Sequence, residues 1–211
     1  MKFVKILGAS LALALAGCAS FTMNEVAPVT MPSMASYTNK PNVFVEFMFY
    51  QGLPTSASAI EVSAAREELK PKLQKLLTDS ELFGRVTMDE FEKQPGDYKL
   101  RLKVYNHPAN GGELFFAFIS GLTLGVVPAM AHDQYSMSLE VLDAQGQRVG
   151  MGNNHDGVET WMGILILPLV AYTPRQAVTD TFGRQVNALL KQMVEQNQVK
   201  YSSLKAVETR G

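Results

Sequence analysis

The sequence has 211 residues, of which 19 are basic, 20 are acidic and one is a cysteine, Cys18. This near-neutral balance of charge argues against nucleic acid as a partner and against binding of anionic lipid by a polybasic segment. A single cysteine excludes an intramolecular disulfide, while the length is sufficient for one hydrophobic core.

The first 17 residues have the layout of a secretory signal. Lys2 and Lys5 are followed by an apolar run from Ile6 to Ala16, and small residues precede Cys18. The apolar run is too short to cross a hydrocarbon core of about 30 Å. One interpretation of this segment is an ordinary signal peptide with a stray cysteine near its end.

The segment Leu15-Ala16-Gly17-Cys18 resembles the lipobox of bacterial lipoproteins at all four positions. The resemblance implies a diacylglyceryl thioether on Cys18, cleavage before it and acylation of the new amino group. Several acyl chains together give stable attachment to a membrane. Ala19 and Ser20 follow, without an aspartate, which by resemblance to enterobacterial sorting signals favours the outer membrane, with the domain facing the periplasm.

Residues 18–41 are expected to form the acylated N-terminus and a flexible tether, because Met, Pro, Ser, Thr and Ala dominate without an apolar period. An ordered strap along the domain is the alternative. A folded domain is expected over 42–197. It begins with a strand over 42–50 that is apolar on both faces, followed by a helix over 56–80. For this helix the sequence predicts a capping box from Ser58 to Glu61 and a kink at Pro71.

Alternating apolar residues predict further strands over 83–91, 98–105, 134–142 and 148–152. The strand over 98–105 alternates most clearly. Its apolar residues are separated by Lys99, Arg101 and Lys103, which we expect on the face of the sheet that meets water. The polar residues 153–157 predict a turn or a bulge, after which the strand continues over 158–161.

The start of the last helix is marked by Thr173, Pro174 and Gln176, which suit the N-cap, the first helical position and a capping box. An apolar stripe follows, which we expect to pack on the sheet: Val178, Phe182, Val186, Leu189, Leu190 and Met193. Residues 198–211 are polar and are expected to fray.

Two segments without charged residues, 114–131 and 161–172, stand apart from this pattern. The first is long enough to cross a bilayer as a helix, and the second is too short. Both are also compatible with the core of the domain, or with lobes at one end of the sheet that dip into the acyl boundary or dock on a partner. The candidate patch for this last interpretation consists of Phe115, Phe116, Phe118, Ile119, Leu122, Trp161, Ile164, Ile166 and Leu167.

The order of elements predicts an α+β fold, a two-layer sandwich in which two amphipathic helices cover a mostly antiparallel sheet of about five strands. The strands over 98–105, 135–142 and 147–152 are expected at its centre. Element order and lipobox together resemble small envelope lipoprotein domains, such as the N-terminal domain of TolB and the lipoproteins that activate peptidoglycan synthases. That resemblance carries no functional residues.

No catalytic, metal-binding or cofactor-binding residues are predicted. The histidines His107, His132 and His155 form no HExxH pair, and G-x-S-x-G is absent. We therefore expect a non-catalytic lipoprotein, held on the membrane through Cys18, that binds an envelope protein or supports envelope assembly. One alternative is a binder of lipid or another hydrophobic ligand, with segments 114–131 and 161–172 lining the cavity. A second is a cell-wall hydrolase, whose two carboxylates would leave no signal in the sequence.

Overall fold

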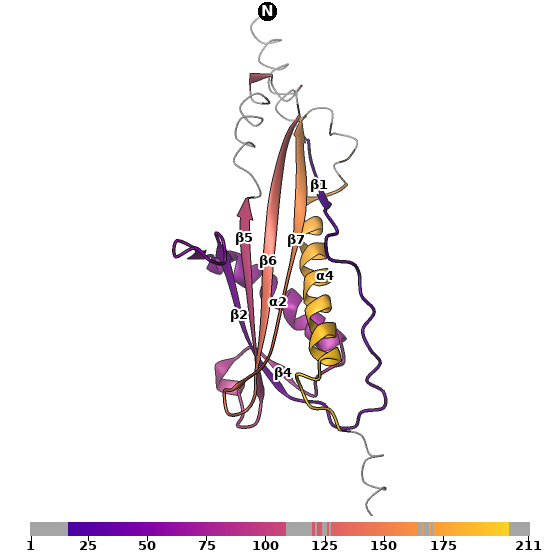
Figure 1. Cartoon of the computed structure of the whole chain (residues 1–211). Helices are drawn as coiled ribbons and strands as arrows, with labels where there is room; N and C mark the ends of the chain where they lie inside the picture. The colour runs from indigo at the N-terminus through magenta and orange to yellow at the C-terminus, as the bar shows by residue number, and fades with distance from the viewer. Residues whose placement is uncertain are drawn as a thin grey trace, which may run out of the picture. The chain divides into compact units, whose positions relative to one another are not determined.

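The computed structural model describes residues 17–108, 120, 122–123, 126, 128–163, 166, 169 and 171–202. Its elements follow the chain in the order shown in Figure 1: β1 (Gly17–Thr22), β2 (Val43–Gln51), β3 (Ile60–Glu61), α2 (Ser63–Asp79), β4 (Val86–Thr87), the 3-10 helix η1 (Glu90–Glu92), β5 (Tyr98–Pro108), β6 (Ala129–Leu142), β7 (Arg148–Gly163) and α4 (Pro174–Glu195).

The described strands form a mixed sheet of seven strands in the order β1-β7-β6-β5-β2-β3, with β4 also paired to β2. Strand β2 runs parallel to β4 and β5 and antiparallel to β3, and β1 runs antiparallel to β7. The predicted α+β class is confirmed, with β5 and β6 inside the sheet. The two strands beyond the prediction are β1, which falls in the predicted tether, and β3, which falls in the predicted first helix. The strand predicted over 83–91 is present only as β4, Val86–Thr87.

The chain divides into two compact units. Unit 1 contains residues 1–25, 107–134 and 156–182, and unit 2 contains 26–106, 135–155 and 183–211. Strands β6 and β7 and helix α4 contribute residues to both.

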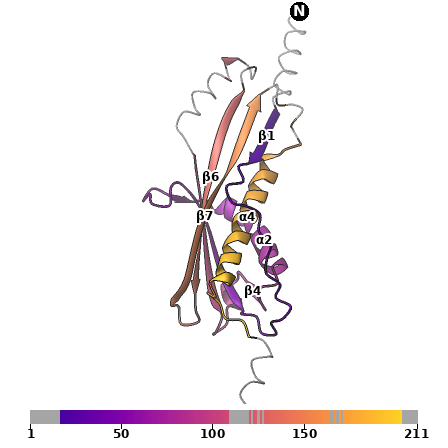
Figure 2. The same cartoon turned by 45° about the vertical axis from the view of Figure 1, so that its right-hand side comes forward.

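In unit 2, α2 and the second part of α4 cover the same face of the sheet, as predicted (Figure 2). Buried side chains from both helices and three strands surround an interior gap of only about 10 Å³, too small for an ordered ligand. They are Val45, Leu100, Leu102 and Leu139 of the sheet, Leu73 and Leu77 of α2, and Val186, Leu189 and Leu190 of α4.

Helix α2 begins at Ser63, seven residues later than the predicted Ser56, and the predicted capping box does not form. Instead Ile60 and Glu61 pair with β2, and the backbone N–H of Val62 donates to the carbonyl of Phe49 at 2.8 Å. The backbone N–H of Ser58, which the box would have served, donates to the hydroxyl of Ser56 at 3.2 Å. Pro71 lies inside the helix, as predicted.

Helix α4 begins as the sequence predicts. Pro174 is its first residue, and the hydroxyl of Thr173 accepts a hydrogen bond from the backbone N–H of Gln176 at 3.3 Å. Of the predicted stripe, Val178 is only half-buried. The other members are buried: Phe182, Val186, Leu189, Leu190 and Met193.

Strand β7 runs without a break through 153–157, where a turn or bulge was predicted. The polar side chain there has a partner on the helix: Asn154 donates through Nδ2 to the carbonyl of Gln185 at 2.9 Å and accepts from Gln185 Nε2 at 3.1 Å. Gln185 Nε2 also donates to the carbonyl of Tyr135 at 2.8 Å. Asn153 and His155 are exposed, whereas Asn154 and the buried Asp156 lie on the packed side. The stretch is therefore a strand whose polar residues meet water on one face and hydrogen-bond partners on the other.

The end of the chain is also more closely packed than predicted. Gln198 and Val199 are buried, and the backbone of Ser202 pairs with Asn39. Residues 198–202 are therefore packed within unit 2 through buried Val199 and the backbone bridge of Ser202, although their composition is mostly polar. The remainder of the predicted tail, 203–211, lies outside the described residues.

Candidate functional site

The candidate attachment point, Cys18, is the second residue of β1 and is exposed. Composition predicted a tether here, but Gly17–Thr22 pairs with β7 over six residues, from Gly17 opposite Gly163 to Thr22 opposite Val158. Ala19, directly after Cys18, is fully buried, and Ser20 is also buried. The chain therefore enters the packed part of unit 1 at the residue that follows the cysteine.

Hydrogen bonds hold β1 on both sides. The hydroxyls of Ser20 and Thr160 lie 2.7 Å apart, and the backbone N–H of Ser20 donates to the carbonyl of Tyr172 at 2.8 Å. Just beyond β1, the backbone N–H of Glu25 donates to the buried carboxylate of Asp156 at 3.1 Å. These contacts fasten the segment as far as Glu25.

The predicted apolar patch is only partly within the described residues. Leu122 is exposed, Trp161 is half-buried and lies opposite Ala19, and Ile166 is buried. The other predicted members lie outside the described residues: Phe115, Phe116, Phe118, Ile119, Ile164 and Leu167.

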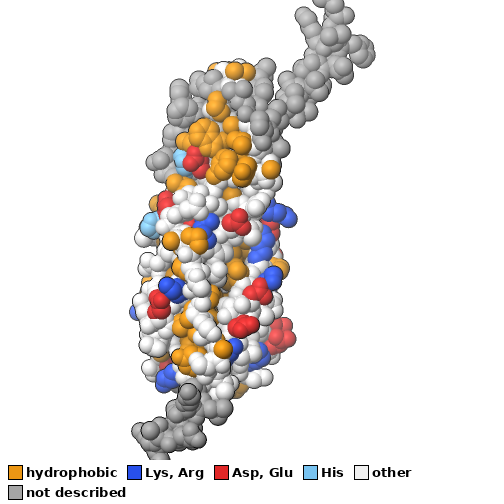
Figure 3. All heavy atoms as spheres, turned by 90° about the vertical axis from the view of Figure 1, so that its right-hand side faces the viewer, with side chains coloured by type: hydrophobic (Ala, Val, Ile, Leu, Met, Phe, Trp, Pro, Cys, Tyr) orange, Lys and Arg blue, Asp and Glu red, His pale blue; other side chains and the backbone are white. Residues whose placement is uncertain are grey.

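Other apolar side chains of unit 1 are exposed. Tyr172 is 53% exposed and Leu169 is 37% exposed, and the ring of Tyr172 lies 5.1 Å from that of Phe21 in β1. Figure 3 shows hydrophobic side chains gathered on the face where β1 lies in Figure 1. Phe21 was missed from the sequence because it falls in the predicted tether. Within the described part of the chain, no helix combines the length and apolarity needed to cross a membrane.

In unit 2, the face of the sheet away from the helices carries charges. Glu46 Oε2 accepts from Arg101 Nε at 2.6 Å and lies 3.0 Å from Lys99 Nζ, while Arg101 Nη1 donates to Glu140 Oε2 at 2.7 Å. Lys99 also lies over the ring of Phe44, 5.9 Å from its centre. The charged ladder of Glu46, Lys99, Arg101 and Glu140 fits the predicted water-facing side of β5.

The ladder changes the acidity of Glu46. Burial raises the pKa of this carboxyl, but hydrogen bonds from Arg101 and Lys99, and their positive charges, outweigh burial. The pKa of Glu46 consequently lies below its usual value of 4.5, and the group is charged at neutral pH.

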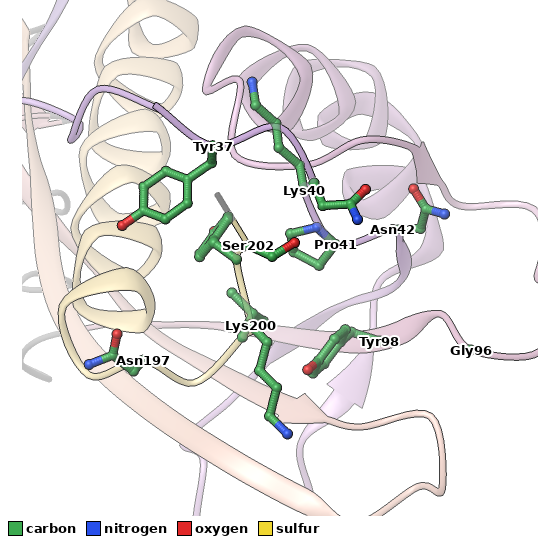
Figure 4. Close-up of a pocket in the computed structure, with 12 residues that line it drawn as sticks. Tyr37, Lys40, Pro41, Asn42, Gly96, Tyr98, Asn197, Lys200 and Ser202 are labelled. Carbon is green, nitrogen blue, oxygen red and sulfur yellow. The ribbon is translucent and has the colours of Figure 1, made fainter. Parts of the chain in front are cut away.

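Unit 2 also contains an open cleft of about 620 Å³ between residues 37–42, the turn before β5 and residues 197–202 (Figure 4). Lys40 and Lys200 line it, and their side chains point toward opposite ends of the view. Burial, and then neighbouring Tyr37, raise the pKa of Tyr201, so its phenol stays neutral. No carboxylate, histidine or thiol is among the residues that line the cleft.

The histidines were the remaining candidates for a metal site. His132 Nε2 lies 3.9 Å from Glu159 Oε2. Among the described residues, no group of three or more His, Cys, Asp or Glu side chains is placed to hold a metal ion.

No protein-family model matches the chain, and the comparison with curated proteins found no match. Among solved structures, the chain is similar to a minor lipoprotein from Acinetobacter baumannii, with 9% identity over 78% of this chain and 98% of that one and a TM-score of 0.39. PelC from Paraburkholderia phytofirmans, solved as a dodecamer, has 10% identity, coverage of 82% and 96%, and a TM-score of 0.34. A putative neuraminyllactose-binding hemagglutinin homolog from Helicobacter pylori has 10% identity, coverage of 80% and 88%, and a TM-score of 0.41. At these values none of the three assigns a function to this chain.

Proposed function

We propose that the mature chain is a lipid-anchored protein of the bacterial outer membrane, attached through Cys18 and facing the periplasm, which binds a protein partner without catalysing a reaction. The observation that carries the proposal is the lipobox Leu15-Ala16-Gly17-Cys18, whose cysteine is the only one in the chain and is exposed. An exposed side chain can carry acyl groups without forcing them into the core of unit 1.

The neighbouring residues are consistent with an acylated cysteine. Ala19 and Ser20 are buried, so the fold is built from the residue after Cys18 onward. A free exposed thiol would be open to oxidation in the periplasm, and acylation removes it. These points support attachment at Cys18 independently of the apolar segments.

The non-catalytic part of the proposal is supported by the chemistry of the described surfaces. The cleft of unit 2 has no carboxylate or histidine among its lining residues, and the carboxylates of the ladder, Glu46 and Glu140, are engaged by Arg101. Ion-paired groups of this kind suit recognition of a complementary protein surface more than proton transfer. We assign the partner-binding role to the ladder face.

The test of attachment replaces Cys18 by serine in the full-length precursor. The Cys18→Ser protein should remain as precursor or appear as a soluble periplasmic form. Globomycin, which blocks the lipoprotein signal peptidase, should make wild-type precursor accumulate. Ser10→Ala is the matched control, since it changes the signal segment and leaves the lipobox intact. Normal processing and membrane retention of Cys18→Ser would refute the attachment.

The test of partner binding places a photo-crosslinking residue at position 103. Lys103 lies on the same face of β5 as Lys99 and Arg101. Irradiation of intact cells should give a discrete protein adduct. The same residue at Gln74, exposed on α2, is the control and should give none. If position 103 yields no adduct beyond those of position 74, the ladder face is not the partner surface.

A further inference from the structure

Almost no chain separates Cys18, the proposed acylation site, from the folded part of unit 1. Cys18 lies within β1, opposite Met162 of β7, and the next residue, Ala19, is fully buried opposite Trp161. One residue of extended chain spans about 3.3–3.6 Å. Acyl chains on Cys18 would thus leave the protein at the surface of unit 1, and not at the far end of a tether.

Apolar side chains lie on the segment that contacts β1. The backbone carbonyl of Tyr172 accepts from Ser20, two residues after the cysteine, and the ring of Tyr172 packs against Phe21 at 5.1 Å. The backbone N–H of Tyr172 donates to the carbonyl of Leu169 at 2.9 Å. Both Tyr172 and Leu169 are exposed. The same turn that fastens β1 therefore presents an aromatic and an aliphatic side chain to the surroundings.

The two segments carry no charge. Residues 17–24 and 160–174 contain no Asp, Glu, Lys or Arg. These two segments therefore bring no ionised side chain of their own into a contact with lipid headgroups and the start of the acyl region, where burying a charge is the largest cost. Glu159 of β7, which lies opposite Phe21, borders the surface and would have to stay at the level of the headgroups. Tyrosine is favoured at this depth because its ring is apolar and its hydroxyl remains hydrated.

We propose that β1 and the segment 169–172 form a membrane-docking surface, so that unit 1 rests on the bilayer at the boundary between headgroups and acyl chains. The inference rests on the proposed acylation of Cys18 and adds where the protein lies relative to the lipid. The bilayer is the occupant because acyl chains on Cys18 hold lipid at the end of β1. The side chain of Cys18 points to the face of the strand opposite to Phe21, so lipid meets segment 169–172 at the edge of β1, where the backbone N–H of Ser20 donates to the carbonyl of Tyr172. Attachment at Cys18 gives even a weak apolar contact a high effective concentration of lipid.

The single tryptophan of the chain, Trp161, gives a native probe, since it lies opposite the residue after Cys18. Acylated wild-type protein is reconstituted into vesicles of phosphatidylethanolamine and phosphatidylglycerol whose acyl chains are brominated near the headgroup. Docking predicts a loss of Trp161 emission relative to unbrominated vesicles. A variant with a flexible Gly-Ser insert between Cys18 and Ala19 should lose part of that quenching.

Side-chain variants separate docking from attachment. Tyr172→Ser and Leu169→Ser should reduce the quenching of Trp161, whereas Leu53→Ser, which removes an exposed leucine of unit 2, should not. Intact mass spectrometry on each sample reports acylation of Cys18. Acylated protein whose Trp161 is not quenched overturns the docking surface and leaves the proposed attachment standing. Absence of the acyl mass in the wild-type protein overturns both the docking surface and the attachment. A photo-crosslinking residue at position 172 tests the other occupant: a protein adduct in cells, together with no quenching in vesicles, assigns the surface to a protein partner instead.

Discussion

The turn before β5 depends on one buried carboxylate, and we expect its replacement to destabilise unit 2. The side chain of Asp97 is 3% exposed. Arg85 Nη2 donates to both of its oxygens, at 2.8 Å and 2.6 Å, and the backbone N–H of Gln94 donates to Oδ2 at 2.8 Å. Asp97→Asn keeps the shape of the side chain but removes the charge and turns an NH₂ donor toward groups that are themselves donors.

The magnitude follows from the exposure of the two partners. Breaking a fully buried ion pair costs about 3–5 kcal/mol. The side chain of Arg85 is 30% exposed, so water recovers part of its solvation in the variant and the cost falls. We expect a loss of about 2–3 kcal/mol in the free energy of unfolding. For a domain of this size each kcal/mol lowers the melting temperature by about 2–4 °C, which gives a decrease of roughly 4–12 °C.

Thermal unfolding of the soluble Cys18→Ser chain, followed by circular dichroism, measures this decrease. The control is Asp79→Asn, which removes an exposed pair with Lys75 on α2 and should lower stability by less than about 0.5 kcal/mol. If Asp97→Asn and Asp79→Asn melt at the same temperature, the reasoning that ranks ion pairs by burial in this protein is wrong.

Two further predictions concern the ladder and the helix packing. Because Arg101 and Lys99 lower the pKa of Glu46, the stability that this group contributes is fully present above its ordinary value of 4.5 and is lost as the pH falls through the lower pKa of the folded state. Urea unfolding should therefore show Glu46→Gln less stable than wild type at neutral pH, with the difference closing as the pH falls below 4.5, and a constant difference would contradict this. Gly183→Ala, at a helical position where the nearest neighbour of the added Cβ is 3.9 Å away, should gain about 0.5–1 kcal/mol. Gly152→Ala should gain less, because its Cβ would lie 2.8 Å from the flexible end of Gln192, which must move, and 3.0 Å from the buried Leu189. Equal effects of the two alanines would exclude the close approach.

Local signals predicted the elements whose ends and faces are set by near neighbours in sequence. The start of α4 follows from Thr173 and Pro174, whose contributions need nothing beyond the first turn of the helix. The alternation of β5 likewise predicted which face meets α2 and α4 and which face carries Lys99 and Arg101. The α+β class followed from these long, periodic segments.

Elements that depend on distant partners were not predictable in the same way. Strand β1 exists because Gly17–Thr22 pairs with β7, about 140 residues further along the chain, and its six residues include no periodic pattern. The polar stretch of β7 was assigned to a turn because its partner, Gln185, belongs to a helix predicted separately. At the candidate site, the motif predicted Cys18 itself, while its place inside a strand, and the contact of Phe21 with Tyr172, required the tertiary pairing.

The second uncharged segment, 161–172, changes from buried to exposed along its length, and this bears on the two interpretations left open for it, core of the domain or surface lobe. Its first residues continue β7 to Gly163, Ile166 is buried, and Leu169 and Tyr172 are exposed. If the whole segment lay in the core, the side chain of its last residue, Tyr172, would not be exposed. Burial at one end and exposure at the other is the arrangement that lets the same segment anchor itself in unit 1 and offer Leu169 and Tyr172 to the bilayer.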